Sequence, residues 1–195
     1  MIWYCASRIL ASACFLSFAW GMARHFRRIG KPAAWMRVTA SLAIPFALLN
    51  LAALFFRDIR FPVSASILYA ASLSTFWSSV SVSRGALAAC GQSHVSFHLL
   101  KRGPYRLARH PFYLSYDLAW IAGFVATTWW ALGLIAIVMA ALYERFVIEE
   151  ERGFLGSDLA EEYAAYKKRA GKYWPRFNSR LTRAVSSANR NAHFL

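Results

Sequence analysis

Long stretches without charged side chains limit the fold of this chain more than any other feature. Positions 38–56 and 61–83 carry no charge, and positions 111–143 carry only Asp117. A helix of about 20 predominantly apolar residues spans a bilayer. Hydrophobic residues make up 58% of the chain and charged residues 16%, which is typical of membrane proteins. The sequence therefore predicts an all-α integral membrane protein.

The spacing of the apolar stretches predicts about five transmembrane helices. The first three are expected at positions 2–23, 38–56 and 61–83. The stretch at 111–143 is too long for one span at a rise of about 1.5 Å per residue. We therefore expect a C-terminal helical hairpin that turns near positions 127–130, followed by a cytoplasmic helical C-terminal segment.

The net charge of +14 is distributed unevenly along the chain. Basic residues gather at positions 24–37, 84–109 and 167–190, whereas the turns at 57–60 and 127–130 are nearly neutral or uncharged. Because cytoplasmic loops of membrane proteins carry the excess of Lys and Arg, this pattern places the N-terminus outside and the C-terminus in the cytoplasm. The charge indicates topology and attraction to anionic lipid, and no nucleic acid partner is expected.

The N-terminal apolar run contains no clean signal-peptide cleavage site and is expected to stay as the first span. A short chain with a retained first span suggests the inner membrane of a bacterium. Cys5, Cys14 and Cys90 form no CxxC pair, so we assign them no chemistry. His94 and His98 could face the same side of a helix, but no third ligand is adjacent, so no metal site is predicted.

Asp117 is costly in lipid and should face the helix bundle or a wet cavity. Two roles stay open for it. Its carboxylate could contact a substrate, or it could pair with one of the eight serines at positions 61–83. Those small hydroxyl side chains also let neighbouring helices approach closely, which favours a tight bundle.

A basic corner is expected where the fourth helix begins. Arg109 and His110 precede Pro111, and proline suits the first position of a helix because its missing N–H would be unpaired there. The free N–H groups and the positive dipole end of this helix would face Arg109 and His110. The corner therefore predicts a small anion-binding site.

An acidic trio lies downstream, where the fifth helix is expected to leave the membrane. Carboxylates gain nothing from the dipole at a helix C-terminus, so Glu149, Glu150 and Glu151 need a cationic partner. The candidates are a cationic ligand or one of the arginines Arg106, Arg109 and Arg145.

The second half of the chain presents its motifs in a distinctive order: Gly103-Pro104-Tyr105-Arg106, Arg109-His110-Pro111-x-Tyr113, the expected hairpin, Glu150-Glu151, Tyr163-x-x-Tyr166 and Lys172-x-x-Pro175. This order resembles the isoprenylcysteine carboxyl methyltransferase and phospholipid methyltransferase family of integral membrane enzymes. The resemblance covers positions 99–177. Two departures are visible: Asp158-Leu159 stands where the family often has Phe-Gly, and Lys172 stands where arginine is usual.

The resemblance implies methyl transfer from S-adenosyl-L-methionine, bound at the cytoplasmic side, to a lipophilic acceptor such as a prenylated cysteine, a phospholipid amine or a small lipid. It divides the chain into a three-span bundle with its loop at 1–98, a cofactor-binding part at 99–177 and a basic tail at 178–195. The implied catalytic residues are Arg109, Glu151 and Arg169. The implied cofactor-binding residues are Tyr105, His110, Pro111, Tyr113, Glu150 and Tyr163.

Two other functions stay open from the sequence. A membrane reductase of the sterol type also has an Arg-His-Pro-x-Tyr corner but uses NADPH, and such chains are about twice as long. A non-catalytic membrane adaptor is the second alternative, in which the acidic and basic segments simply pair with each other.

Overall fold

The computed structural model describes residues 1–26, 34–83 and 99–176. Within these residues the protein is helical, which confirms the predicted class. The elements are α1 (Ile2–Trp20), the π-helical turn η1 (Gly21–His25), α2 (Ala34–Phe56), α3 (Pro62–Ser83), the 3-10 turn η3 (Gly103–Arg106), α4 (Pro111–Thr127), α5 (Trp130–Leu155) and α6 (Ala160–Arg169). Positions 84–98 of the loop expected at 84–110, with Cys90, His94 and His98, and the tail at 178–195 lie outside the described residues.

In the described part of the chain, three helical stretches are long and apolar enough to cross a membrane, namely Ile2–His25, Met36–Phe56 and Trp130–Leu155. Their outer faces expose large apolar side chains: Leu16 is 70% exposed, Leu48 62% and Ile137 69%. Contiguous apolar surface of this kind is unfavourable in water and suits contact with lipid. These helices give the protein the character of a membrane protein.

The remaining two long helices do not reach the same apolar character. α3 and α4 lie close to the predicted positions, but α3 contains many serines and α4 has 17 residues. The first helix also differs from the expectation, because it continues past position 23 as the π-helical turn η1. The last residue of that turn, His25, is buried and its Nε2 lies 2.7 Å from Ser83 Oγ.

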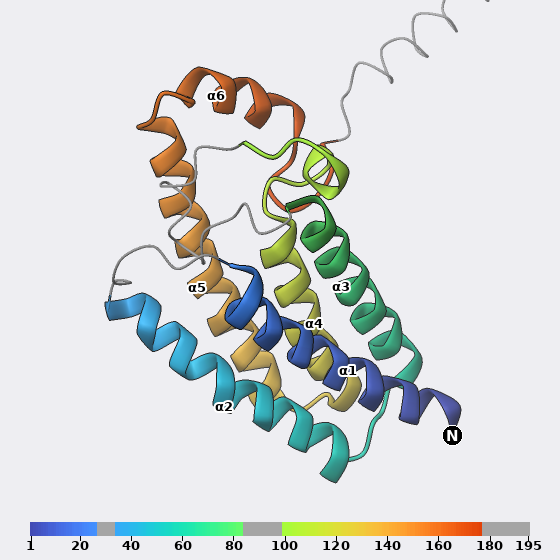
Figure 1. Ribbon diagram of the computed structural model, residues 1–195. Coiled ribbons are helices and arrows are strands. Elements are labelled where there is room, and N and C mark those ends of the chain that lie inside the picture. The colour runs from blue at the N-terminus through green and yellow to red at the C-terminus, as the bar shows by residue number, and fades with distance from the viewer. Residues whose placement is uncertain (27–33, 84–98, 177–195) are drawn as a thin grey trace, which may run out of the picture.

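α3 packs against both α1 and α4 (Figure 1). Serine side chains mediate both contacts: Ser72 Oγ donates to the carbonyl oxygen of Ser115 at 2.7 Å, and the hydroxyls of Ser7 and Ser66 lie 2.9 Å apart. All four serines are buried. The small hydroxyl side chains therefore permit the close helix approach that the sequence predicted.

α4 and α5 pack against each other and are joined by a short turn. Thr128 adopts a left-handed conformation with φ 52°, and its amide donates to the carbonyl oxygen of Phe124 at 2.7 Å. This turn ends α4, and Trp129 leads directly into α5. The N-terminus of α4 and the C-terminus of α5 therefore meet at the same end of the bundle, where Figure 1 shows α6 and the segment that contains η3.

Candidate functional site

Two backbone segments that are far apart in the sequence pair just before α4 begins. The amide of Arg109 donates to the carbonyl oxygen of Gly171 at 2.8 Å, and the amide of His110 donates to that of Lys172 at 3.1 Å. A side chain at Gly171 would overlap the carbonyl oxygen of Trp174, so only glycine fits. This pairing sets the backbone position of the basic corner against the end of the C-terminal segment.

Arg109 joins α5 to the end of α6. Its Nη2 and Nε donate to Glu151 Oε1 at 2.8 and 3.1 Å, and its Nη1 donates to the carbonyl oxygen of Ala170 at 2.7 Å. Lys167 Nζ binds the other carboxylate oxygen of Glu151 at 2.8 Å. The side chains of Arg109 and Glu151 are only 5% and 12% exposed, so little water screens this pair.

His110 lies between the two glutamates. Its Nδ1 is 3.5 Å from Glu150 Oε2, and its Nε2 is 3.3 Å from Glu151 Oε1. Tyr113 donates its hydroxyl to Glu150 Oε1 at 2.5 Å. Burial alone lowers the pKa of His110, but hydrogen bonds to Glu150 and Glu151 and their charges outweigh it and raise the pKa above its usual value. The charged imidazolium, a donor at both ring nitrogens, is therefore favoured.

Tyrosines enclose this cluster on the α6 side. Tyr105 is buried, and its hydroxyl has no hydrogen-bond partner among the described residues. Burial and the charge of Glu150 raise its pKa well above the usual value. Tyr163 is 1% exposed and stacks on Phe154 with ring centroids 4.9 Å apart. Tyr166 donates its hydroxyl to the carbonyl oxygen of Tyr105 at 2.5 Å, which ties α6 to the η3 segment.

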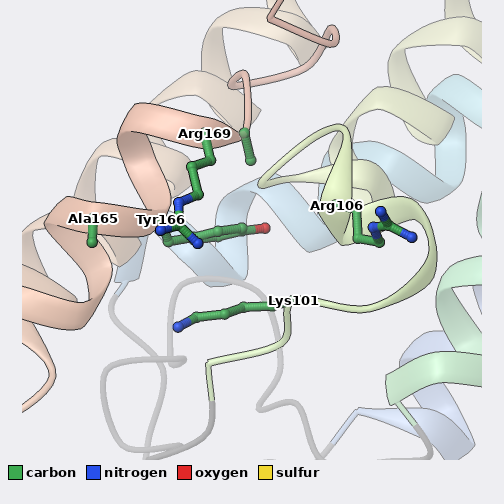
Figure 2. Close-up of a pocket in the computed structure, with 6 residues that line it drawn as sticks. Lys101, Arg106, Ala165, Tyr166 and Arg169 are labelled. Carbon is green, nitrogen blue, oxygen red and sulfur yellow. The ribbon is translucent and has the colours of Figure 1, made fainter.

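The described contacts unite most of the residues expected in the site. Pro111 is the buried first residue of α4, as predicted. Arg169 is the exception, because its exposed side chain lines a separate cavity with Tyr166, Lys101 and Arg106 (Figure 2). Lys167, two residues earlier on α6, is the α6 residue that binds Glu151. The catalytic role implied for Arg169 stays a prediction.

Two further glutamates near this end of the bundle also have partners. Glu149 lies 3.9 Å from Arg145, one turn away on the same helix. Glu144 binds Lys172 and accepts a hydrogen bond from the Tyr173 hydroxyl at 2.9 Å. Lys167, Glu144 and Tyr173 were missed from the sequence, because nothing in their spacing indicates the backbone pairing that brings these segments together.

Asp117 makes no hydrogen bond to a serine of α3 in the part of the chain that the structure describes. Its Oδ1 is buried without a hydrogen-bond partner there. Of the two roles left open from the sequence, pairing with an α3 serine is therefore not observed.

The cluster has groups of the kinds that S-adenosylmethionine needs. Carboxylate oxygens of Glu150 can accept hydrogen bonds from its ammonium group or ribose hydroxyls, and His110 can donate to its carboxylate. The buried Tyr105 hydroxyl, which lacks a partner among the described residues, is a further polar group for a ligand to satisfy. The donors and acceptors present therefore fit this cofactor.

Comparisons with protein-family models, curated proteins and solved structures gave no match to this chain. Within the described residues no group of three or more His, Cys, Asp or Glu side chains is placed to hold a metal ion. The evidence that bears on function is therefore the geometry of the site.

Proposed function

We propose that the protein is an integral membrane methyltransferase that uses S-adenosyl-L-methionine and acts on a lipophilic acceptor at the cytoplasmic face. In this proposal α1 to α5 all cross the membrane, with the N-terminus outside and the C-terminus in the cytoplasm. The observation that carries it is the direct contact of Arg109 and His110 with Glu150 and Glu151. The same residues belong to the motifs whose order resembles the methyltransferase family.

The cofactor supplies an electrophilic methyl group on a sulfonium centre. The protein binds and orients it: Glu150 accepts hydrogen bonds and His110 donates them. Burial of these side chains excludes water from the reacting groups. Alignment of this kind lowers the barrier by about 7–11 kcal/mol in favourable cases.

The site favours acceptors that arrive already ionised. An amine acceptor must lose a proton to a base, and the candidates for that base are His110 and Glu151. Both are hindered as bases here, because Glu150 and Glu151 contact the two ring nitrogens of His110 and favour its protonated form, and because Arg109 and Lys167 bind both oxygens of Glu151. A carboxylate or thiolate on a lipophilic molecule needs no base and suits the site better.

Calorimetric titration of the detergent-solubilised chain with S-adenosylhomocysteine, the demethylated product, tests the proposal. We expect binding, and we expect Glu150→Gln to weaken it by about tenfold or more through loss of a charge-assisted hydrogen bond. Glu149→Gln is the matched control, because it removes the same charge one position away, where Glu149 faces Arg145. Absence of heat with folded wild-type protein at high concentration would overturn the proposal.

A non-catalytic membrane adaptor is the second candidate, and one observation favours it. The guanidinium of Arg109 donates to Glu151 and to the carbonyl oxygen of Ala170, as expected of a residue with a purely structural role. In that case Glu150→Gln lowers stability, and neither it nor the wild type binds S-adenosylhomocysteine. Mass spectrometry of lipid extracts from cells with and without the chain, searching for one added methylene group, would then also show no difference.

A further inference from the structure

The segment that follows α6 is fastened to α5 by the carboxylate of Glu144. Figure 1 shows this segment returning to the end of the bundle where α4 begins. Lys172 Nζ binds Glu144 Oε1, and the hydroxyl of Tyr173 donates to Glu144 Oε2 at 2.9 Å. The ammonium group of Lys172 also lies 5.8 Å from the centroid of the Tyr173 ring. Both oxygens of Glu144 therefore hold consecutive residues of this segment.

The same two residues of the segment contact His110, which directly precedes α4. The amide of His110 donates to the carbonyl oxygen of Lys172 at 3.1 Å. The ring centroids of Tyr173 and His110 lie 6.5 Å apart. Glu144 on α5 and His110 at the start of α4 are therefore linked through Lys172 and Tyr173.

A purely structural role for Glu144, as a fastener of the segment, has to be examined first. The backbone is already fixed before Lys172, because the amide of Arg109 donates to the carbonyl oxygen of Gly171 at 2.8 Å and the amide of Gly171 donates to that of Leu107 at 3.1 Å. These bonds set the path of the chain and leave the side chain of Tyr173 undetermined. The contact with Glu144 is what holds that ring beside the imidazole.

The hydrogen bond between Tyr173 and Glu144 is the stronger part of this arrangement. Burial, the hydrogen bond to Glu144 and the charges of nearby carboxylates raise the pKa of Tyr173 above its usual value, so its hydroxyl stays a donor at neutral pH. The side chains of Lys172 and Glu144 are 31% and 41% exposed, and water screens their ion pair. The ion pair therefore adds less than the hydroxyl does to the position of the ring.

We propose that Glu144 is a positioning residue for the proposed methyl transfer and that it acts on the imidazole of His110 through the two residues it binds. This inference rests on the proposed function, in which His110 donates to the cofactor. The ring nitrogens of His110 lie 3.5 Å from Glu150 and 3.3 Å from Glu151, so a displaced ring loses at least one of these contacts. A misplacement of about 1 Å in such a site can cost about 100-fold.

A double-variant cycle on the detergent-solubilised full chain tests this role, with affinity for S-adenosylhomocysteine measured by calorimetry. Glu144→Ala should weaken binding by about tenfold in the wild-type background and by less than about twofold in the His110→Gln background. Equal losses in the two backgrounds, or no loss in either, would overturn the proposal. Glu149→Ala is the matched control, because it removes a carboxylate paired with Arg145 on the same helix, and it should change affinity by less than about twofold.

Nitrogen-15 NMR of the histidine-labelled chain at fixed pH gives a second measurement that needs no ligand. The signals of His110 are those lost in His110→Gln. Glu144→Ala should move them and Glu149→Ala should not, and unmoved signals in Glu144→Ala would overturn the proposal whatever the affinity. Tyr173→Phe keeps the packing of the ring without its bond to Glu144, and should move the same signals if Glu144→Ala does not fold. If these signals move but the wild type binds no S-adenosylhomocysteine, the methyltransferase proposal fails and the placement of His110 by Glu144 stands.

Discussion

Replacing Arg109 by Gln should release α6 from the rest of the protein. The guanidinium loses two hydrogen bonds to Glu151 and one to the carbonyl oxygen of Ala170. Breaking a buried ion pair costs about 3–5 kcal/mol. Because Lys167 and His110 still contact Glu151, the lower end of that range applies, and the unpaired carbonyl adds about 1 kcal/mol. We expect a loss of about 3–4 kcal/mol.

Arg109→Gln should lower the stability of α6 locally as well as the stability of the whole protein, because Arg109 connects α5 to the end of α6. Hydrogen exchange followed by mass spectrometry should show protection over residues 160–176 falling by about 100- to 1,000-fold, whereas α3 keeps its protection. Equilibrium unfolding in mixed micelles measures the global change. Arg145→Gln is the control, because Arg145 is 60% exposed and 3.9 Å from Glu149, so its loss should cost about 0.5 kcal/mol or less.

A cost below about 1 kcal/mol for Arg109→Gln, the range of exposed pairs, would show that this ion pair does not hold α6 in place. Exchange of the α6 amides at the wild-type rate would also show that Arg109 does not hold that helix. A Lys at this position should recover only part of the stability, because one ammonium group cannot reproduce the separate donors that reach Glu151 and Ala170.

Three further predictions concern Tyr113, His110 and the contact between α2 and α4. Tyr113→Phe removes the hydroxyl bound to Glu150 without opening a cavity, and should lower the unfolding free energy by about 1.5–3 kcal/mol in the same micelles; a change within error would exclude that hydrogen bond. The raised pKa of His110 gives stability that is complete below the ordinary value of 6.5 and is lost as the pH rises through the raised value, so His110→Gln should flatten that decline in pH-dependent unfolding; an unchanged slope would assign the decline to another group. Gly123→Ala would place a methyl group against the side chain of Asn50 and should cost about 1–3 kcal/mol by thermal unfolding in detergent, whereas an unchanged midpoint would show that α2 and α4 can separate freely.

The helices could be predicted well from the sequence because apolar length and proline position act locally. α2 ends at Phe56, as expected from the charged residues that follow, and α4 begins at Pro111. The π-helical turn at the end of the first helix was missed. It places His25 against Ser83, and such a tertiary contact has no signature in hydropathy.

The candidate site was only partly visible in the sequence. Arg109, His110, Glu150 and Glu151 were expected together, and they contact one another. Lys167 was missed as the partner of Glu151, and Arg169 lines a separate cavity, because the rotation of α6 depends on burial of Tyr163 against Phe154 and of Tyr166 against the η3 segment. A short helix with basic residues at three consecutive positions does not indicate which of them will face inward.

The position of each glutamate on α5 suggests how one cluster can serve both stability and binding. An α-helix turns by about 100° per residue, so consecutive side chains face different neighbours. Glu149 faces Arg145 on its own helix, Glu150 reaches Tyr113 of α4, and Glu151 reaches Arg109 and Lys167. Because Glu151 is held by two cations that anchor α6, a ligand that displaced them would also release that helix. Under the proposed function, Glu150 is therefore the carboxylate that exchanges its contacts for a ligand, and changes at Glu150 and Glu151 should separate ligand affinity from the stability of α6.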